Sequence, residues 1–454
     1  DRTGQGVRAT TLVGRLIGVE QAVVEGFDIV DDQARGRLVL AAQVRPYRRA
    51  KPRCSQCGVR CPGYDQGGGQ RRWRALDLGE IVVYLAATMF RVTCPEHGVV
   101  VAKVGWAHPG SRFTAAFEDS AAWMSANMPA TAVATFLRVT FRAVDGIVTR
   151  VVARAAGKVD LLDGLTSIAI DEVAYRKGQR YLTVIVDNDT GRLVWAAKGH
   201  GKAVLGAFFD ALGPHRAAQL QLVSADGAGT ADGWIATVVK QRAAQAVRCM
   251  DPFHTVAWAT EALDQVRRAT VRHLSAAGDK AGLELVKGSR WALLKNPVNL
   301  TAAQASTLAG VKEANADLFT AHVLKEQLRA VFHPPAGAGG RSVLAAWLSM
   351  VDEAGLPAFD VVADKVRRAL PEIRATLDHH MNSARAEANN TTVRMLTRRG
   401  FGYHSADALI AITMLKRSGL CPDPSRSPIP ARQPANRSSR LTPKWITADP
   451  RKQQ

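Results

Sequence analysis

The sequence predicts a multidomain protein of mixed α/β and α class, and three observations carry this prediction. Four of the six cysteines gather between residues 51 and 100. Short β-rich runs and helical signals follow one another between residues 166 and 250. A basic and almost wholly helical stretch extends from residue 251 to about residue 380. The chain of 454 residues is long enough for about three domains.

The charge balance points to a polyanionic partner. The chain carries 60 Lys and Arg against 40 Asp and Glu, a formal net charge of +20, and its pI is near 10.1. Such a balance favours nucleic acid first and an anionic membrane surface second. No apolar run approaches the ~20 residues that span a bilayer, and no secretory signal is expected at the N-terminus. Collagen-like, coiled-coil, transmembrane and disulfide-scaffold classes are excluded.

The cysteine cluster predicts a zinc-binding module over residues 1–110. Cys54 and Cys57 form a C-x-x-C pair, and Cys94 and His97 form a C-x-x-H pair about forty residues later. Two-residue gaps let one tight turn offer two ligands, and two such pairs supply the four ligands of tetrahedral Zn²⁺. Cys61 is an alternative fourth ligand in place of His97. A redox role is weaker because no βαβ pattern surrounds the pair.

A helix-turn-helix is predicted within residues 111–160. A short helix over 130–136 meets a second helix over 140–151 through a tight connection at 137–139. Thr140 fits an N-cap and is, with Arg142 and Arg150, a candidate DNA contact. Arg142 and Arg150 are expected to face outward, while Val144, Ile147 and Val148 pack inward. Such a module places its second helix in the major groove of DNA, and the alternative is an ordinary helical hairpin.

Acidic residues follow two predicted strands. Asp171 ends the apolar run 167–170, and Asp226 ends the run 220–225. If those strands are neighbours, the carboxylates converge and need a cation, for which Mg²⁺ or Mn²⁺ is suited. A third carboxylate is expected later in the chain. Glu387 lies on a helical stretch whose same face carries cations that suit a phosphate backbone, namely Arg394 and Arg398.

Asp251 and His254 are the alternative catalytic pair. Asp251 precedes Pro252, an arrangement typical of an N-cap with proline at the first helical position. It remains the runner-up for the second metal carboxylate, and His254, one turn later, is placed to point toward the same cleft. Glu172 alternates to the opposite strand face from Asp171 and is a poorer ligand candidate.

The order of these motifs resembles bacterial transposases of the ISL-three insertion-sequence family, from about Arg53 to Leu415. The cysteine module, the helix-turn-helix and residues 170–187 match its first blocks in order. Residues 223–226, 249–254 and 262–268 resemble the next blocks, and residues 291–297 and 324–328 resemble its helical insertion. Residues 387–389 and 397–402 resemble the last block. This chain has C-x-x-H where the family usually has two cysteines, and Ala388 where glycine is common.

The resemblance implies a ribonuclease-H-like catalytic core interrupted by an all-α insertion. It divides the chain into a core over 161–260 and 381–420, an insertion over 261–380 and a disordered basic tail over 421–454. Asp171, Asp226 and Glu387 become the acidic triad for Mg²⁺ or Mn²⁺, with Zn²⁺ in the N-terminal module. The separation of 161 positions from Asp226 to Glu387 (387 − 226) fits such an insertion.

The implied activity is metal-dependent DNA cleavage and strand transfer at terminal inverted repeats. The expected partners are double-stranded DNA, both repeat and target, and a second copy of the chain on DNA, without a membrane. The expected location is the bacterial cytoplasm, in association with the nucleoid. The rival hypothesis is a catalytically inactive DNA-binding regulator that keeps the zinc module and the helix-turn-helix.

Overall fold

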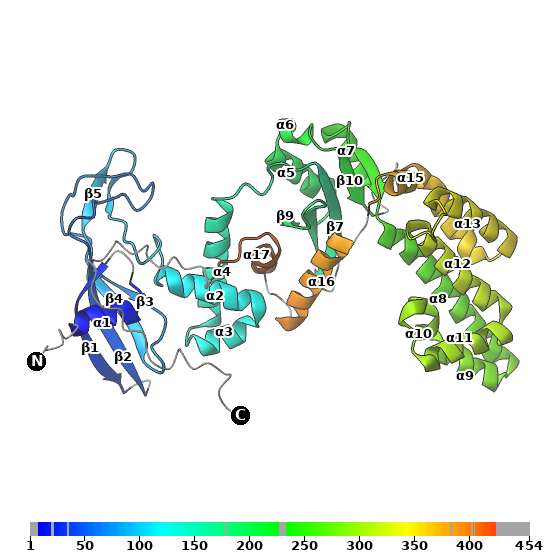
Figure 1. Cartoon of the computed structure of the whole chain (residues 1–454), viewed down its shortest axis with the longest axis horizontal. Helices are drawn as coiled ribbons and strands as arrows, with labels where there is room; N and C mark the ends of the chain where they lie inside the picture. The colour runs from blue at the N-terminus through cyan, green and yellow to red at the C-terminus, as the bar shows by residue number, and fades with distance from the viewer. Residues whose placement is uncertain are drawn as a thin grey trace, which may run out of the picture.

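The computed structural model describes residues 8–19, 22–33, 36–176, 178, 180–226, 233–381, 384–400, 403 and 405–423. Figure 1 shows an elongated molecule with an N-terminal β-rich part, a central sheet with helices on both sides, and a helical part at the far end. The predicted basic tail is outside the described residues from position 424 onward. Within the described part of the chain, no helix is both long and apolar enough to cross a bilayer.

The N-terminal part is built on a four-stranded sheet. Its strand order is β1-β2-β4-β3, with helix α1 (Ala9–Leu16) before it; the strands are β1 (Ala22–Asp32), β2 (Arg37–Pro46), β3 (Gln70–Arg74) and β4 (Val82–Thr88). Trp73 and Trp106 meet edge to face in its core. A hairpin of β5 (Arg91–Cys94) and β6 (Gly98–Val101) carries a separate small cluster that contains three cysteines.

Three helices connect this part to the central sheet: α2 (Ala115–Asn127), α3 (Ala130–Phe136) and α4 (Phe141–Ala156). The predicted cap at Thr140 is confirmed, because its side chain accepts a hydrogen bond from the backbone of Ala143. The predicted inward residues of α4 are also confirmed as buried: Val144, Ile147 and Val148.

The central sheet has five strands in the order β11-β10-β7-β8-β9. Strands β7, β8 and β9 are successive antiparallel neighbours, whereas β10 and β11 run parallel to β7. Their bounds are β7 (Ser167–Arg176), β8 (Arg180–Asp187), β9 (Leu193–Lys198), β10 (Leu222–Ala225) and β11 (Val247–Met250). The predicted strand that begins at Leu220 therefore begins two residues later.

The two faces of this sheet pack against different helices. Ile168, Ile170 and Ile185 face the helices between β9 and β11, which are α5 (Lys202–Leu212), α6 (Pro214–Ala217) and α7 (Trp234–Arg242). Ala169 and Val184 belong to a cluster on α4 and the C-terminal helices. Alternate residues of one strand point to opposite faces, so each strand contributes to both layers.

Residues 252–378 are helical apart from short connections. The helices are α8 (Pro252–Ala277), α9 (Lys280–Gly288), α10 (Arg290–Leu294), α11 (Ala302–Ala314), α12 (Ala316–Phe332), α13 (Gly340–Ala354), α14 (Pro357–Arg368) and α15 (Leu370–Asp378). They share one hydrophobic cluster centred on buried Trp347. The hydroxyl of Thr376 donates to the carbonyl of Met250 at 2.7 Å, which anchors α15 to the sheet.

The chain then returns to the central part as α16 (Ala384–Arg399) and α17 (Ala406–Arg417). In Figure 1 the orange helix α16 lies beside β7, and α17 lies next to α4. Leu396 and Leu409 join the same cluster as Val144 and Ile147. The last carbonyls of α2 also accept from the C-terminal part, since Lys416 Nζ donates to Ala126 at 2.8 Å.

Candidate functional site

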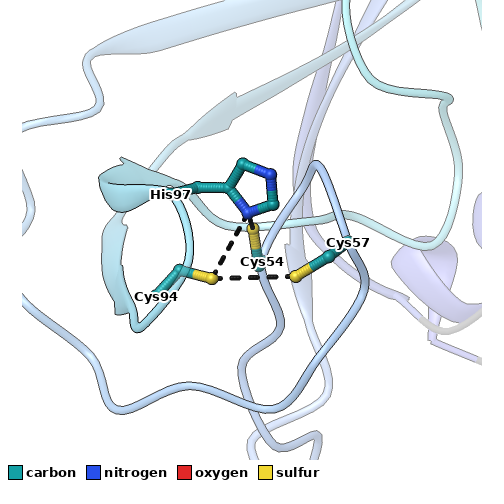
Figure 2. Close-up of side chains that lie close together, drawn as sticks. All are labelled: Cys54, Cys57, Cys94 and His97. Atoms are coloured by element: carbon teal, nitrogen blue, oxygen red, sulfur yellow. Dashed lines mark hydrogen bonds between the residues drawn. The ribbon is translucent and has the colours of Figure 1, made fainter.

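Two pairs of zinc-type ligands meet in the N-terminal part, as Figure 2 shows. The ligand atoms of Cys54, Cys57, Cys94 and His97 all lie within 4.8 Å of one another. Cys54 and Cys57 belong to the loop before β3, Cys94 ends β5, and His97 lies in the turn to β6, which the positive φ of Gly98 (65°) permits.

The geometry and chemistry of this group fit zinc. The sulfurs of Cys57 and Cys94 are 3.7 Å apart, close to the about 3.8 Å that two Zn–S bonds of about 2.3 Å give at a tetrahedral angle. The hydrogen bond with His97 lowers the pKa of Cys94 to about 6, so its thiolate, the form that binds metal, is present at neutral pH.

The structure favours His97 over Cys61 as the fourth ligand. His97 Nδ1 is 3.5 Å from Cys94 Sγ and 3.9 Å from Cys54 Sγ. Cys61 is buried beside the group, but its thiol donates to the carbonyl of Val59 at 3.4 Å. The C-x-x-H pair of Cys94 and His97 therefore supplies the two zinc ligands that a second C-x-x-C pair would supply.

Three aspartates lie at corresponding positions of three adjacent parallel strands. Ser224 of β10 pairs with Ala169 of β7, and Ala225 pairs with Met250 of β11. Asp226 directly follows the last residue of β10, and Asp251 directly follows the last residue of β11. Asp171 lies two residues after Ala169 on β7. The amide of Asp251 donates to the carbonyl of Ala225 at 2.8 Å, which holds this row together. Parallel strands thus bring to one edge of the sheet acids that lie 80 residues apart (251 − 171).

Helix α16 brings further polar side chains to Asp171. The amide Nδ2 of Asn390 donates to Asp171 Oδ2, and the backbone of Glu172 donates to Oδ1 at 2.6 Å. Glu387, one helical turn before Asn390, interacts electrostatically with both Asp251 and Asp171. Three acids that are far apart in sequence are therefore electrostatic neighbours.

Charge repulsion and burial are visible in the protonation equilibria. Burial raises the pKa of Asp171, which is only 9% exposed, and the charge of Asp251 raises it further. Burial also raises the pKa of Glu387, and again Asp251 adds to the effect. His254 offsets part of this effect at both acids, and Arg394 does so at Glu387. Glu172, expected on the opposite face, also interacts with Asp226, and burial followed by that charge raises its pKa.

Asp251 caps α8, as predicted, and it also forms a hydrogen bond with His254. Its Oδ1 accepts from the backbone of Phe253 at 2.8 Å, which caps α8, and its Oδ2 accepts from His254 Nδ1 at 3.2 Å. Burial lowers the pKa of His254, but this bond and the charges of Asp251, Asp171 and Asp226 outweigh it, so the pKa is raised. The neighbouring acids therefore favour the protonated form of His254.

The cationic candidates divide into exposed and paired side chains. Arg142, Arg394 and Arg398 are exposed. Arg150 differs from the expectation: its Nε and Nη2 donate to Glu118 at 2.9 and 2.7 Å. Because the guanidinium of Arg150 is already paired with a buried carboxylate, Arg150 is a weaker candidate for a DNA contact than Arg142.

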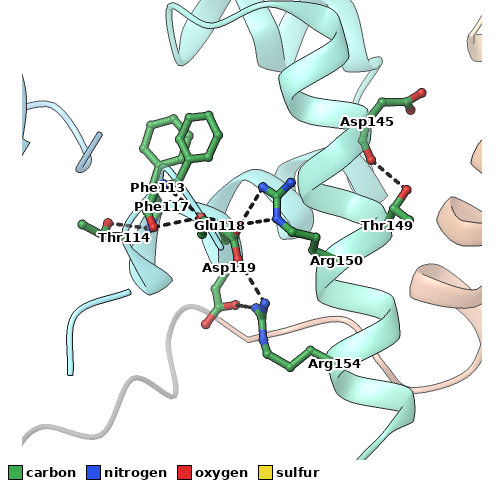
Figure 3. Close-up of polar contacts among 10 residues, drawn as sticks. Phe113, Thr114, Phe117, Glu118, Asp119, Asp145, Thr149, Arg150 and Arg154 are labelled. Carbon is green, nitrogen blue, oxygen red and sulfur yellow. Dashed lines mark hydrogen bonds and ion pairs between the residues drawn. The ribbon is translucent and has the colours of Figure 1, made fainter. Parts of the chain in front are cut away.

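Glu118 organises the helix-turn-helix, and it was not among the predicted residues. Figure 3 shows its fully buried carboxylate between α2 and α4, where it receives Arg150 and Arg154. Arg154 Nη1 donates at 3.0 Å, and the hydroxyl of Ser111 at 2.9 Å. The recognisable signal was the i, i+4 spacing of the two arginines opposite an acid on a buried helix face.

The connection of the helix-turn-helix is fixed to the N-terminal sheet. Arg138 has a left-handed backbone with φ of 54°, unusual for a residue with a side chain. Its guanidinium pairs with Asp77, which also pairs with Arg74 at 2.5 Å. Arg74 Nη2 lies 3.4 Å from the carbonyl of Leu137. The N-terminal module and the helix-turn-helix therefore share a polar junction.

A zinc-type module, a helix-turn-helix and a sheet edge lined with acids are together the parts of a DDE transposase, and comparison with known families confirms this class. The family profile described as "Transposase", of ISL3 type, matches residues 168–413. The helix-turn-helix domain of transposase family ISL3 matches residues 102–152. The zinc-finger of transposases IS204, IS1001, IS1096 and IS1165 matches residues 50–97.

Relatives that match most of the chain are also transposases. The transposase for insertion sequence element IS1557 of Mycobacterium tuberculosis, found in strains CDC 1551 and H37Rv, is 42% identical over 436 residues, which cover 92% of this chain and 97% of the relative. The transposase for insertion sequence element IS1001 of Bordetella parapertussis is 28% identical over 356 residues, 78% of this chain and 86% of that protein. The chain belongs to the ISL3 family of transposases.

Proposed function

We propose that this transposase binds the terminal inverted repeats of an insertion sequence and cuts and joins DNA at the row of acids on the central sheet. The observation that supports the proposal is that β10 and β7 are neighbours whose register brings Asp226 and Asp171 to one sheet edge. The charge of Asp171 also acts on Glu387 of α16. The mixed strand order β11-β10-β7-β8-β9 supports a ribonuclease-H-like core. Residues 252–378 then form an all-α insertion between β11 and α16.

The proposed division of the chain follows from these parts. A zinc-binding domain spans 1–110, and a helix-turn-helix domain spans 111–160. The catalytic core comprises 161–260 and 381–420, with the insertion over 261–380 between them and a basic tail over 421–454. The polar junction through Arg74 and Asp77 supports joint action of the first two domains on one repeat.

The acids fit Mg²⁺ or Mn²⁺, because hard oxygen ligands suit these ions and several carboxylates gather at this edge of the sheet. Asp171, Asp226 and Glu387 would hold the ions, which when bound activate the attacking oxygen and stabilise the leaving oxygen of a phosphodiester. His254 lies beside these acids and offsets part of their repulsion.

The exposed arginines are proposed to contact DNA. Arg394 and Arg398 lie on the same helix as Glu387 and are exposed, so they neutralise phosphates of the strand that enters the site. Arg142 sits in the first turn of α4, where a recognition helix contacts DNA. Because the two ends of the element must be brought together, we expect a homodimer on DNA. The expected location is the bacterial cytoplasm, in association with the nucleoid.

The test is Asp171→Asn in the full chain with DNA that carries the element's own ends. We expect cleavage to fall by at least about 100-fold, which is about 3 kcal/mol of lost transition-state stabilisation. Binding to the repeat stays within about threefold, because the DNA-binding contacts are elsewhere. Asp210→Asn, an exposed α5 carboxylate paired with Arg242 at 2.9 Å, is the control and keeps full activity.

Three results would contradict the proposal. Cleavage by Asp171→Asn at the wild-type rate would remove the acid from the reaction. Equal loss of binding and cleavage would make its role structural. A wild-type protein that binds the repeats with Mg²⁺ or Mn²⁺ present but makes no cut would favour the DNA-binding regulator.

A further inference from the structure

Asn390 is a buried amide aimed at the acids, and no predicted role includes it. It is 6% exposed and lies on α16 three residues after Glu387, so the two side chains share a helix face. Its Nδ2 donates to Asp171 Oδ2. Its Oδ1 is fully buried and has no hydrogen-bond partner among the described residues.

The orientation of the amide is settled by its neighbour. If the amide were flipped, its oxygen would face the Asp171 carboxylate, and two acceptors would repel each other. Because Nδ2 donates to Asp171, Oδ1 is the amide atom that has no hydrogen-bond partner among the described residues. A buried acceptor without a partner costs about 1–3 kcal/mol, so a native protein keeps one where something else satisfies it.

The surroundings indicate what that partner is. Asn390 contacts the Asp171 carboxylate, and the charges of Asp251 and Glu387 also act on this place. Ionised carboxylates are acceptors only, so they cannot satisfy another oxygen. His254 directs its Nδ1 to Asp251. A divalent cation is the partner that both an amide oxygen and carboxylates accept.

We propose that Asn390 is a metal-positioning residue, whose Nδ2 fixes the Asp171 carboxylate while its Oδ1 faces the cation or a water bound to it. This inference rests on the proposed function, because it assumes a cation at Asp171 and Glu387. It adds a neutral fourth oxygen to the acids, carried by the same helix as the last of them. The pattern Glu387-x-x-Asn390 is then one unit, delivered to the sheet by a single helix.

The adjacent residue Asn389 provides a matched control. It is as buried as Asn390, at 1% exposed, but its amide is fully used inside the protein. Its Nδ2 donates to the carbonyls of Gly191 and Arg385 at 3.1 and 2.9 Å, and its Oδ1 accepts from Arg417 Nε at 2.8 Å. Asn389 therefore anchors α16, whereas Asn390 serves the acids.

The experiment measures Mn²⁺ binding directly, by electron paramagnetic resonance of the free ion, in the zinc-loaded full chain without DNA. Wild type, Asn390→Ala, Asn390→Asp, Asn389→Ala and Asp171→Asn are compared, with circular dichroism and zinc content as checks of folding. We expect Asn390→Ala to weaken Mn²⁺ binding by about 10- to 100-fold. Asn389→Ala lowers the melting temperature but leaves Mn²⁺ affinity within about twofold.

The near-isosteric variant separates the two atoms of the amide. Asn390→Asp keeps an oxygen at the place of Oδ1, so it binds Mn²⁺ more tightly than Asn390→Ala. Equal Mn²⁺ affinity in these two variants would overturn the assignment of Oδ1 to the cation. Wild-type affinity in Asn390→Ala would overturn the whole inference and leave the proposed function intact. If instead Asp171→Asn binds Mn²⁺ as wild type does, the proposed metal site itself fails.

Discussion

The buried carboxylate of Glu118 yields a sharp quantitative prediction for Glu118→Ala. It receives four hydrogen bonds, from Ser111, Arg150 (two) and Arg154, at 2.7 to 3.0 Å. Hydrogen bonds to charged groups contribute about 1.5–3 kcal/mol each, but the side chains of Arg150 and Arg154 are 41% and 22% exposed and regain water after truncation. We therefore expect a loss of about 3 kcal/mol, the low end for a broken buried pair.

Hydrogen–deuterium exchange is the suitable assay, because a multidomain chain does not unfold in two states. A loss of about 3 kcal/mol speeds exchange of the α4 amides by about 100-fold. Exchange in α12, which belongs to a different hydrophobic cluster, stays unchanged. Repeat binding weakens because α4 loses its fixed position against α2.

Asp119→Ala is the matched control. Asp119 is the next residue on α2 and pairs only at the surface, with Arg154 at 3.3 Å and a side chain that is 43% exposed. Such pairs contribute about 0–1 kcal/mol. If Glu118→Ala speeds α4 exchange by less than about threefold, or no more than Asp119→Ala does, the buried network does not hold the helices together.

Three further predictions follow from the sites described. His97→Ala lowers zinc below one ion per chain by mass spectrometry, whereas Cys61→Ala retains it; the reverse result would make Cys61 the ligand. Burial raises the pKa of Asp171, so its neutral form favours folding at low pH and this contribution is lost as pH rises through the raised pKa. Without divalent cations, the melting temperature of wild type relative to Asp171→Asn therefore falls as the pH rises above the ordinary carboxyl pKa of about 4; a flat difference contradicts this. Arg142→Ala lowers the salt slope of repeat binding by about one, and an unchanged slope removes it from the interface.

Local spacing was sufficient to predict the zinc ligands and the helix-turn-helix. Two ligand pairs with two-residue gaps, and Thr140 before an amphipathic run, carry their geometry in a few residues. The order of β-rich runs likewise predicted β7 to β11, and chain order with the family resemblance indicated Asp171, Asp226 and Glu387.

Contacts between distant segments could not be predicted in the same way. Asn390 is 219 residues from Asp171, and nothing in the pattern of α16 distinguishes it from Asn389. Whether an arginine faces solvent or a buried acid depends on the partner helix, and the sequence of α4 alone therefore predicted that Arg150 faces outward. The pairing of Arg138 with Asp77 likewise joins two modules across 61 residues.

The shared core of α4, α16 and α17 has a consequence for synthesis of the protein. Val144 and Ile147, made early, pack in one cluster with Leu409 and Leu415, made more than 250 residues later. The helices of the helix-turn-helix therefore complete this core only after α17 has been synthesised. A polypeptide cut short before α17 would lack both that support and, if it stops before residue 387, the last acid. Under the proposed function, support for the helix-turn-helix and the last acid of the site are thus supplied by the same late part of the chain.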